Sequence, residues 1–412
     1  MLLPDMLKPA FFQPFIFPTQ APGHAMQTIL STEEIPIKLW LGDMEEGALQ
    51  QARNLANLPF AYHHIAIMPD AHFGYGMPIG AILATDDVII PNGVGVDIGC
   101  GMCAVKTSLQ HIERHEIKQV MKAIRATIPL GFNRHKKALH RSLMPELDGS
   151  LPIVEREYNH ARAQIGTLGG GNHFIEIQRG RDNFIWFMVH SGSRNLGYQV
   201  AKHYNKLATN LNKQWQSPIP SSWQLAYLPM DSNDGQTYFR EMNYCLAFAR
   251  ANRMSMCKRV EEALMENVST EIDFEKPLNI AHNYAARESH FGKTVYIHRK
   301  GATRAESGEK GIIPGSQGSS SYIVCGKGNP ESFRSCSHGA GRKLGRKQAQ
   351  RELNLEQEKR QLDEKNILHA IRGRKDLEEA AGAYKDIEIV VERQNDLVDT
   401  LEILQPLAVI KG

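Results

Sequence analysis

Glycine-rich turns recur along this chain, and each places Asp, Cys, His or Asn at the end of an apolar run or just beyond it. Such turns hold polar side chains at strand ends beside exposed backbone amides. The residues so placed are Asp70 and His72 (MPDAHFGYG), Asp97 and Cys100 (VGVDIGCG), Asn172 and His173 (GGGNHFIE), His190 (MVHSGSR), His282 (AHNY) and His338 (CSHGAGR). Any one of them alone is most simply a core or turn residue. Their repetition predicts one site assembled from distant segments.

Helices are predicted where apolar residues recur at intervals of three and four, and strands where short β-branched runs occur. The helical segments are 45–58, 114–128, 199–211 and 239–268, with a mostly polar segment at 343–371. The strand segments are 64–68, 94–98, 184–190, 294–298, 322–325 and 407–410. Neither a long repeat nor a regular strand–helix alternation is present. The pattern therefore predicts an α+β fold, a single large domain of mixed β-sheets surrounded by helices, with the polar 216–235 loop as an insertion.

Composition limits the class of protein. With 42% hydrophobic and 23% charged residues over 412 positions, the chain can bury a large core. Six cysteines are too few for a disulfide framework and favour a reducing, cytoplasmic location. Pro14 and Pro18 interrupt the Phe-rich run near the N-terminus, so it predicts neither a signal peptide nor a membrane span. We expect 1–25 to be an N-terminal extension, either disordered or from a start codon placed too early, and 26–412 to be the functional domain.

The net charge of +3 does not identify a nucleic-acid binder, but the distribution of charge is informative. The segment 334–351 holds six Lys or Arg and no acid, which creates a field favourable to a polyanion. The alternative is a solvated helix face balanced by Glu352, Glu356 and Glu358, which follow at once.

Cys, His and Asp together indicate a transition-metal site, because a thiolate and neutral imidazoles are soft and borderline donors while a carboxylate offsets charge. Cys100 and Cys103 form a CxxC, but no second CxxC or HxxxH follows, so half of a zinc ribbon is a weak interpretation. Asp97 and Cys100, with partners dispersed over the chain, favour a catalytic site. Judged by ligand type alone, the metal would be zinc.

Two small-residue loops, GTLGGGNH (166–173) and IPGSQGSSSY (313–322), could bind phosphate oxygens through free amides and hydroxyls. Neither matches the P-loop pattern, and such loops are more often simple turns. The basic segment HRKGATR (298–304) lies just upstream of the second loop and adds cationic donors.

Read in order, MPDAHFGYG, VGVDIGCGM, GTLGGGNHFIE, HSGSRNLG, AHNY, RKGATRA, IPGSQGSSSY, SCSHGAGR, AYKD and a final VIKG resemble the RtcB family of RNA-splicing ligases. The resemblance runs from about residue 26 to Gly412 and leaves out only 1–25 and 216–235. It implies a GTP- and Mn²⁺-dependent enzyme that joins RNA with a 3′-phosphate or 2′,3′-cyclic phosphate to RNA with a 5′-hydroxyl, in tRNA splicing or RNA repair. It also implies an RtcB-like fold with a central metal and GTP cleft, a monomer with no membrane association, and an archease-type activator as a partner.

The resemblance also assigns residues. His338 would be the nucleophile that becomes linked to GMP. Two Mn²⁺ ions would be bound by Asp97, Cys100, His173, His190 and His282, with Cys100 between them as a thiolate. GTP or GMP would be bound by Asn172, His173, Glu176, His282, Asn283, Ser316, Ser321, His338, Gly339, Ala340, Gly341, Tyr384 and Lys411. RNA phosphates would be bound, or guanylylation supported, by Arg194, Lys300, Arg342 and Arg346.

Two other functions fit part of the pattern. One is a metal-dependent phosphoesterase that acts on cyclic phosphates, and the other is a non-catalytic RNA-binding subunit on the same fold. The intact SHGAGR segment around His338 favours the ligase, because a hydrolase has no use for a guanylylated histidine.

Overall fold

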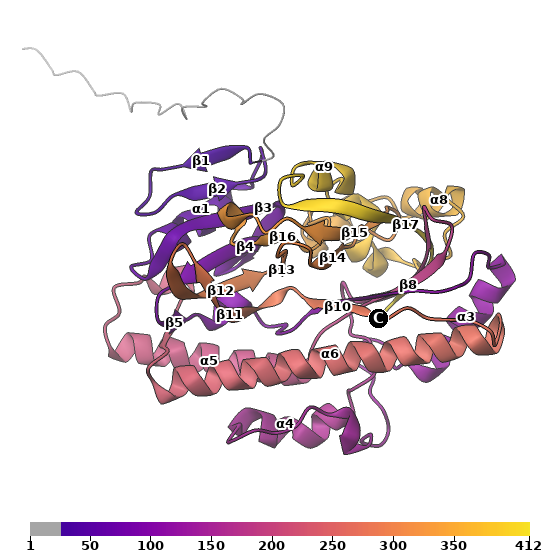
Figure 1. The fold of residues 1–412 in the computed structure, drawn as a ribbon, viewed down its shortest axis with the longest axis horizontal. Helices are drawn as coiled ribbons and strands as arrows, with labels where there is room; N and C mark the ends of the chain where they lie inside the picture. The colour runs from indigo at the N-terminus through magenta and orange to yellow at the C-terminus, as the bar shows by residue number, and fades with distance from the viewer. Residues whose placement is uncertain (1–25) are drawn as a thin grey trace, which may run out of the picture.

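A computed structural model describes residues 26–412, so the expectation for 1–25 lies outside the described residues. Two large sheets organise the fold (Figure 1). The first has the order β1 (Thr28–Leu30), β2 (Ile37–Leu39), β3 (Ala61–Tyr75), β4 (Met77–Thr85), β12 (Lys293–Lys300) and β11 (Asn283–His290). The second has the order β10 (Leu278–Ala281), β6 (Gly101–Lys106), β8 (Ile185–Ser191), β7 (Phe174–Gly180), β17 (Val398–Lys411), β15 (Ser321–Gly326) and β14 (Lys310–Ile313).

The first sheet is mixed, since β2 and β3 are parallel and its other pairs are antiparallel. The second sheet is antiparallel throughout. Two small pairs complete the strands, β13 (Ala302–Arg304) with β16 (Ser335–Ser337) and β5 (Val88–Ile89) with β9 (Leu228–Pro229). Several neighbouring strands, such as β4 with β12 and β7 with β17, are far apart in sequence, so the sheets bring distant segments together.

Helices flank the sheets. They are α1 (Glu46–Ala56), α2 (Pro91–Val94), α3 (Arg114–Thr127), α4 (Pro152–Arg162), α5 (Arg194–Gln214), α6 (Asn233–Asn267), α7 (Arg346–Glu352), α8 (Leu355–Glu364) and α9 (Ile387–Glu392). Ser232 precedes the long α6 and caps its first turn, because its side chain accepts a hydrogen bond from the Gly235 N–H. Figure 1 shows α5 and α6 running along one side of the sheets, with α4 beyond them.

The core follows α6 along its length. Its first half buries Tyr238 and Phe248 in a cluster that also contains residues of α4 and α5. Its second half buries Met256 and Val260 with residues of α3 and with the inward side chains of β6 and β8. Each large apolar side chain buried in this way contributes about 1.5–3 kcal/mol. The helix therefore forms a continuous support beneath the second sheet.

The structure confirms the predicted α+β architecture with mixed sheets in a single domain. The four amphipathic helices appear as α1, α3, α5 and α6, and five of the six predicted strands lie in β3, β8, β12, β15 and β17. No helix in residues 26–412 is long and apolar enough to cross a membrane. All six cysteines lie in this range and are free.

Three local predictions were wrong. The segment 94–98 is not a strand: α2 ends at Val94, and Gly95 and Gly99 take positive φ angles of 91° and 72°, which turn the chain. The segment 343–371 is helical only in part, as two short helices: α7 ends at Glu352 with Leu353 as its C-cap, and Asn354 caps α8 by accepting from Gln357 N–H. The 216–235 segment is not only a polar loop, since it contains β9, which pairs with β5, and the first residues of α6, and Leu225 and Leu228 are buried.

Candidate metal centre and adjoining cavity

Three side chains from adjacent strands of the second sheet converge on one point. The Sγ atom of Cys100 lies 3.4 Å from His173 Nε2 and 3.2 Å from His190 Nε2. The strand pairing explains this, because His190 on β8 is opposite Met102 on one side and Phe174 on the other. Cys100 and His173 stand just before these two neighbouring strands. One donor atom from each residue lies within 4.8 Å of the others, as a shared metal ion requires.

Two further predicted ligands lie at the edge of this cluster. Asp97 Oδ2 is 3.1 Å from His173 Nε2. His282, in the turn between β10 and β11, donates its backbone N–H to the Cys100 carbonyl and packs its ring 5.2 Å from that of His190. All five predicted metal ligands are thus brought together, with Cys100, His173 and His190 closest to one another.

The protonation states suit cation binding. Burial lowers the pKa of His190 and of His282 well below the ordinary value, so both rings are neutral. The His190 Nδ1–H donates to the Asn172 carbonyl at 3.0 Å, which leaves Nε2 with its lone pair facing Cys100. Burial, and then the nearby Asp97, raise the pKa of the Cys100 thiol well above its ordinary value. A bound cation is therefore what would hold Cys100 as a thiolate.

Arg253 on α6 holds the backbone of the metal centre in place. The sequence did not predict a role for this residue. Its guanidinium donates to the carbonyls of Gly99 and Ser191, at 2.8 Å each, and to Asn279 Oδ1 at 2.8 Å. Gly99 directly precedes one predicted ligand and Ser191 directly follows another. The side chain is only 1% exposed, so these bonds are shielded from water.

Asn252, its neighbour on α6, makes a second set of backbone contacts. Its Oδ1 accepts from the N–H groups of Gly166 and Thr167 at 2.7 and 3.1 Å, and its Nδ2 donates to the Gly192 carbonyl at 3.1 Å. These glycine-rich segments lead to His173 and follow His190. Asn252 and Arg253 therefore fix the backbones that carry most of the predicted ligands.

Two glycines are required by close approach. A Cβ atom at Gly169 would lie 1.9 Å from His173 Nδ1 and 2.3 Å from an Arg194 nitrogen, and one at Gly192 would lie 2.3 Å from Asp97 Oδ1. Contacts this short do not occur in folded proteins. The glycine-rich turns thus make room for the predicted metal ligands.

His338 follows β16 and is oriented by Asp70 on β3. Asp70 Oδ2 accepts from the His338 backbone N–H at 3.0 Å and lies 2.7 Å from His338 Nδ1. Burial opposes ionisation of Asp70, but the charge and hydrogen bond of His338 outweigh it, so the Asp70 pKa lies below its ordinary value. The ring of His282 packs 4.8 Å from that of His338, which joins this pair to the metal cluster.

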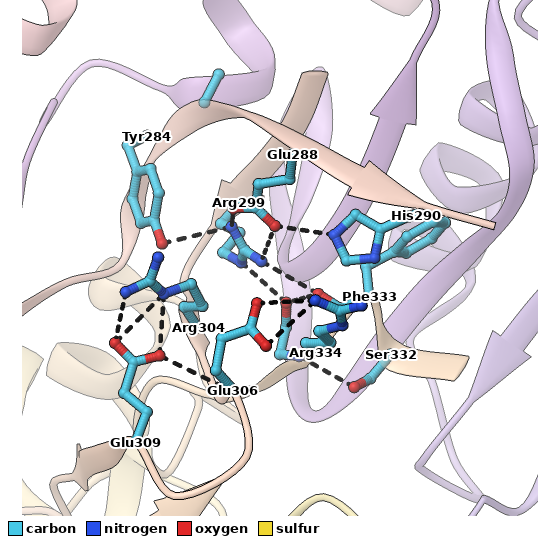
Figure 2. A network of polar contacts seen from close by, with 12 residues as sticks. Tyr284, Glu288, His290, Arg299, Arg304, Glu306, Glu309, Ser332, Phe333 and Arg334 are labelled. Atoms are coloured by element: carbon cyan, nitrogen blue, oxygen red, sulfur yellow. Dashed lines mark hydrogen bonds and ion pairs between the residues drawn. The ribbon is translucent and has the colours of Figure 1, made fainter. Parts of the chain in front are cut away.

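A buried polar network fixes the segment that precedes His338 (Figure 2). Arg299 on β12 is fully buried, pairs with Glu288 at 2.9 Å, and donates to the Phe333 carbonyl and to Ser335 Oγ at 3.1 and 2.9 Å. Because Ser335 begins β16, Arg299 ties the strand before His338 to the first sheet. Figure 2 also shows the outer pairs of this network, Arg304 with Glu309 and Arg334 with Glu306.

A cavity of about 560 Å³ opens beside these groups. Its walls include His190, His282 and His338 together with His72, Phe73 and the basic residues Arg342 and Arg346. A smaller hollow adjoins it and shares Asn172 and Tyr384 with it. Of the residues predicted to bind GTP or GMP, those that line one or both spaces are Asn172, Glu176, His282, Ser316, His338, Gly339, Ala340, Gly341, Tyr384 and Lys411.

The smaller hollow is a buried polar pocket. Burial raises the pKa of Glu176 to about 8, and Glu176 Oε1 accepts from Gln178 Nε2 at 2.9 Å. Glu379, which was not predicted, is buried opposite and accepts from Tyr384 and from Arg342. Lys411 Nζ lies 4.0 Å from the same carboxylate. The pocket therefore presents the carboxyl groups of Glu176 and Glu379 and the amino group of Lys411 to one small ligand.

The other predicted residues lie behind the cavity walls. Asn283 braces the centre, because its Oδ1 accepts from Gly301 N–H at 2.8 Å and its Nδ2 donates to the Asp97 carbonyl at 3.2 Å. Ser321 Oγ accepts from Gly315 N–H at 3.1 Å and so closes the 313–322 loop. His173 belongs to the metal cluster only.

The four predicted phosphate-binding cations divide into two pairs. Arg342 and Arg346 line the cavity. Arg194 instead donates to the Gly131 carbonyl at 2.7 Å and to Thr167 Oγ1 at 3.0 Å. Lys300 is 7% exposed and donates to the carbonyls of Tyr75 and Asn92 at 2.6 and 3.1 Å, and burial lowers its pKa to about 7. Arg194 and Lys300 thus hold backbone in place in this structure.

Comparison with known proteins gives a consistent result. The sequence profile described as "tRNA-splicing ligase RtcB" matches residues 51–151 and 146–412. The RNA-splicing ligase RtcB of Escherichia coli strain K12 is 36% identical over 411 residues, covering 93% of this chain and 99% of the relative. The tRNA-splicing ligase RtcB of Thermococcus kodakarensis is 32% identical over 442 residues, covering 89% and 92%. The matched range includes the 216–235 loop, which the sequence analysis had left out.

Proposed function

The chain belongs to the RtcB family of tRNA-splicing ligases, and from this premise we propose that it is an RNA ligase that uses GTP and Mn²⁺. It would join RNA ending in a 3′-phosphate or 2′,3′-cyclic phosphate to RNA beginning with a 5′-hydroxyl, in tRNA splicing or RNA repair. One observation carries the proposal: His338 lies on a cavity beside a Cys–His cluster and is oriented by a buried carboxylate.

We assign His338 as the nucleophile. Its Nδ1 is engaged by Asp70, so in the tautomer that attacks phosphorus the lone pair is on Nε2. Nε2 would attack the α-phosphorus of GTP, and an N–P bond would form as the bond to the β-phosphate oxygen breaks and pyrophosphate leaves. The Asp70 carboxylate would stabilise the positive charge that the ring gains.

Two Mn²⁺ ions would be held by Asp97, Cys100, His173, His190 and His282. The fit rests on the neutral imidazoles, on the fixed tautomer of His190 and on the buried thiol. Bound there, the ions would withdraw charge from phosphate oxygens and favour attack at phosphorus. The donor types alone would equally accept Zn²⁺, so the choice of manganese rests on the family.

The smaller hollow, about 30 Å³ in this structure, would have to widen to admit a guanine base, and its polar groups suit that ligand. The Glu176 carboxylate can accept from the two adjacent N–H groups of guanine, a pattern that adenine does not present. Ser316, Tyr384 and Lys411 complete its walls. With the base there, the α-phosphate would extend into the larger cavity toward His338, which is consistent with the shared wall at Asn172.

The guanylate would then pass from His338 to the RNA 3′-phosphate, giving an anhydride in place of an unreactive monoester. A cyclic phosphate would first be opened by water. The RNA 5′-hydroxyl would attack the activated phosphorus, and GMP would leave. Arg346 lines the cavity with an exposed side chain and is placed to bind the RNA phosphates, whereas Arg342 lines the cavity but donates to Glu379, Tyr384 and two backbone carbonyls. Arg194 and Lys300 would support the site from behind its walls.

The two alternatives account for less. A phosphoesterase needs the metal cluster but gives no role to His338 or to the buried Asp70 that orients it. An RNA-binding subunit needs neither. Because burying a carboxylate is costly, a purely structural explanation of Asp70 is the weaker one.

Labelled GTP tests the function directly. With GTP labelled at the α-phosphorus and with Mn²⁺, the wild-type protein should retain acid-labile label, and His338→Ala should retain none. His111→Ala, which replaces an exposed histidine, is the matched control. Adding RNA with a 3′-phosphate should discharge the label. Failure of the wild type to take up label, or label that persists in His338→Ala, would contradict the proposal.

A further inference from the structure

We propose that His72 is the general base that takes the proton from the RNA 5′-hydroxyl when the two strands are joined. The proposal rests on the ligase function above and extends it to a residue with no assigned role. His72 lies near the end of β3, two residues after Asp70, and lines the large cavity together with His338.

The hydrogen bonding of His72 fixes its tautomer. Its Nδ1 lies 3.0 Å from the Asp70 carbonyl oxygen, which can only accept, so Nδ1 carries the hydrogen. The lone pair of the neutral ring is then on Nε2. A general base needs a nitrogen with a free lone pair, and Nε2, which makes no bond to the backbone, is that nitrogen.

Asp70 consequently holds both imidazoles. Its carbonyl fixes His72, and its carboxylate fixes His338. Lys385 anchors the same stretch of β3 by donating to the Pro69 carbonyl at 3.1 Å and to the Ala71 carbonyl. The proposed nucleophile His338 and the proposed base His72 are therefore both positioned by Asp70, which keeps the positions of their two rings in the cavity fixed relative to each other.

The other titratable groups around the cavity are already engaged or carry the wrong charge. His190 and His282 are predicted metal ligands and His338 is the proposed nucleophile. The Tyr384 hydroxyl donates to Glu379, and burial raises the pKa of Tyr384. Glu45 is exposed to solvent at the start of α1. The cations that line the cavity are Arg342, Lys343 and Arg346.

His72 is also in the correct charge state. Burial lowers its pKa to about 4, so the ring is neutral and able to accept a proton at neutral pH. The RNA and GMP phosphates that enter the cavity during the reaction would bring negative charge close to the ring. That charge favours the imidazolium form and so strengthens the base when it is needed.

In the joining step, the 5′-oxygen forms a bond to the phosphorus of the guanylated 3′-end, and its proton passes to His72 Nε2. The bond from that phosphorus to the bridging oxygen breaks, and GMP leaves with the electron pair. The proton is later lost to water. No oxidant, reductant or second nucleotide is needed.

Two substitutions separate proton transfer from structural support. In His72→Asn, the amide nitrogen can occupy the position of Nδ1 and keep the bond to the Asp70 carbonyl, but nothing replaces Nε2. In His72→Ala, both are lost, and added imidazole can restore a base. His111→Asn is the control, because that histidine is exposed and lines neither cavity.

The experiment uses an RNA strand already guanylated at its 3′-phosphate, so joining is measured apart from His338 labelling. We expect His72→Asn to slow single-turnover joining by about 10²- to 10⁴-fold, at least tenfold more than it slows His338 labelling with GTP. Imidazole should restore joining by His72→Ala.

Joining by His72→Asn at the wild-type rate, or equal losses in joining and labelling, would overturn the assignment. So would joining by His72→Ala that does not respond to imidazole while its His338 still takes up label. If the wild type takes up no label at all, the ligase function itself has failed, which distinguishes the two outcomes.

Discussion

The Nδ1 atom of His338 lies 2.7 Å from the Oδ2 atom of Asp70, although the two residues are 268 positions apart in the chain. Asp70 is fully buried and its Oδ1 has no hydrogen-bond partner within residues 26–412. Burying a carboxylate costs free energy. The hydrogen bonds that Asp70 Oδ2 makes with the backbone and ring of His338 offset that cost.

Replacing Asp70 by Asn should slow His338 labelling by about 10²- to 10⁴-fold. The amide keeps the shape of the carboxylate but removes the charge that stabilises the modified ring. The measurement is the rate of label uptake from α-labelled GTP. Asp396→Asn is the control, because Asp396 accepts from the Trp40 indole and does not line the cavity. A wild-type rate in Asp70→Asn would show that the pair is only structural.

Cys100→Ala should abolish both labelling and binding of Mn²⁺ at its full stoichiometry while the fold is kept, because the cluster loses its central donor. Cys325→Ala, which lies outside the cluster, should behave as wild type. Metal content is measured after dialysis, together with melting temperature. We also expect Zn²⁺ to inhibit by competing for thiolate and imidazole. Retained Mn²⁺ content in Cys100→Ala would show that the centre lies elsewhere.

Arg253→Lys should weaken Mn²⁺ binding by about 10- to 100-fold, because a lysine cannot reach all three acceptors that the guanidinium fixes. Calorimetric titration with Mn²⁺ and the visible spectrum of bound Co²⁺ report the centre without any turnover. Arg250→Lys, an exposed position on the same helix, is the matched control. Unchanged affinity and an unchanged Co²⁺ spectrum would limit Arg253 to a role in packing.

Guanosine binding should depend on the ionisation of Glu176. Burial raises its pKa to about 8, so the empty pocket holds the neutral acid at pH 7. If guanine binds the carboxylate, affinity should rise with pH up to about 8 and then level off. Guanosine is the suitable probe, because it has no phosphate to titrate. Glu176→Gln should remove the pH dependence, and an unchanged profile in that variant would exclude Glu176 as its source.

Glu288→Gln should destabilise the fold at neutral pH. Burial opposes ionisation of Glu288, but Arg299 outweighs it and lowers the pKa from 4.5 to about 2, which corresponds to roughly 3 kcal/mol. A carboxyl group whose pKa is lower in the folded protein stabilises the fold when the pH is above its pKa in the unfolded chain. This stabilisation is lost as the pH falls from about 4.5 to about 2. Urea unfolding at pH 7 and pH 3 should show the variant and wild type converging at the lower pH. A constant difference would contradict the role of the charge.

Chemistry that depends on residue type could be predicted from the sequence. Cys, His and Asp in glycine-rich turns predicted a transition-metal site, and the resemblance to the RtcB family placed Cys100, His173 and His190 among its ligands. The structure brings these three side chains together. The long apolar pattern at 239–268 likewise predicted α6, since helical periodicity is local. Arg253 falls within that apolar pattern, and this position was the local signal that the arginine is buried.

By itself, the sequence predicted which side chains would bind metal and phosphate, and it determined where the amphipathic helices lie and which family the motifs resemble. Only the tertiary structure decided that Asp70 holds His338 and His72, that Arg253 supports the metal cluster from α6, and that Lys300 bonds to backbone carbonyls. The physical reason is that donor chemistry and periodicity belong to short segments, whereas these contacts depend on strand order and register across the whole fold.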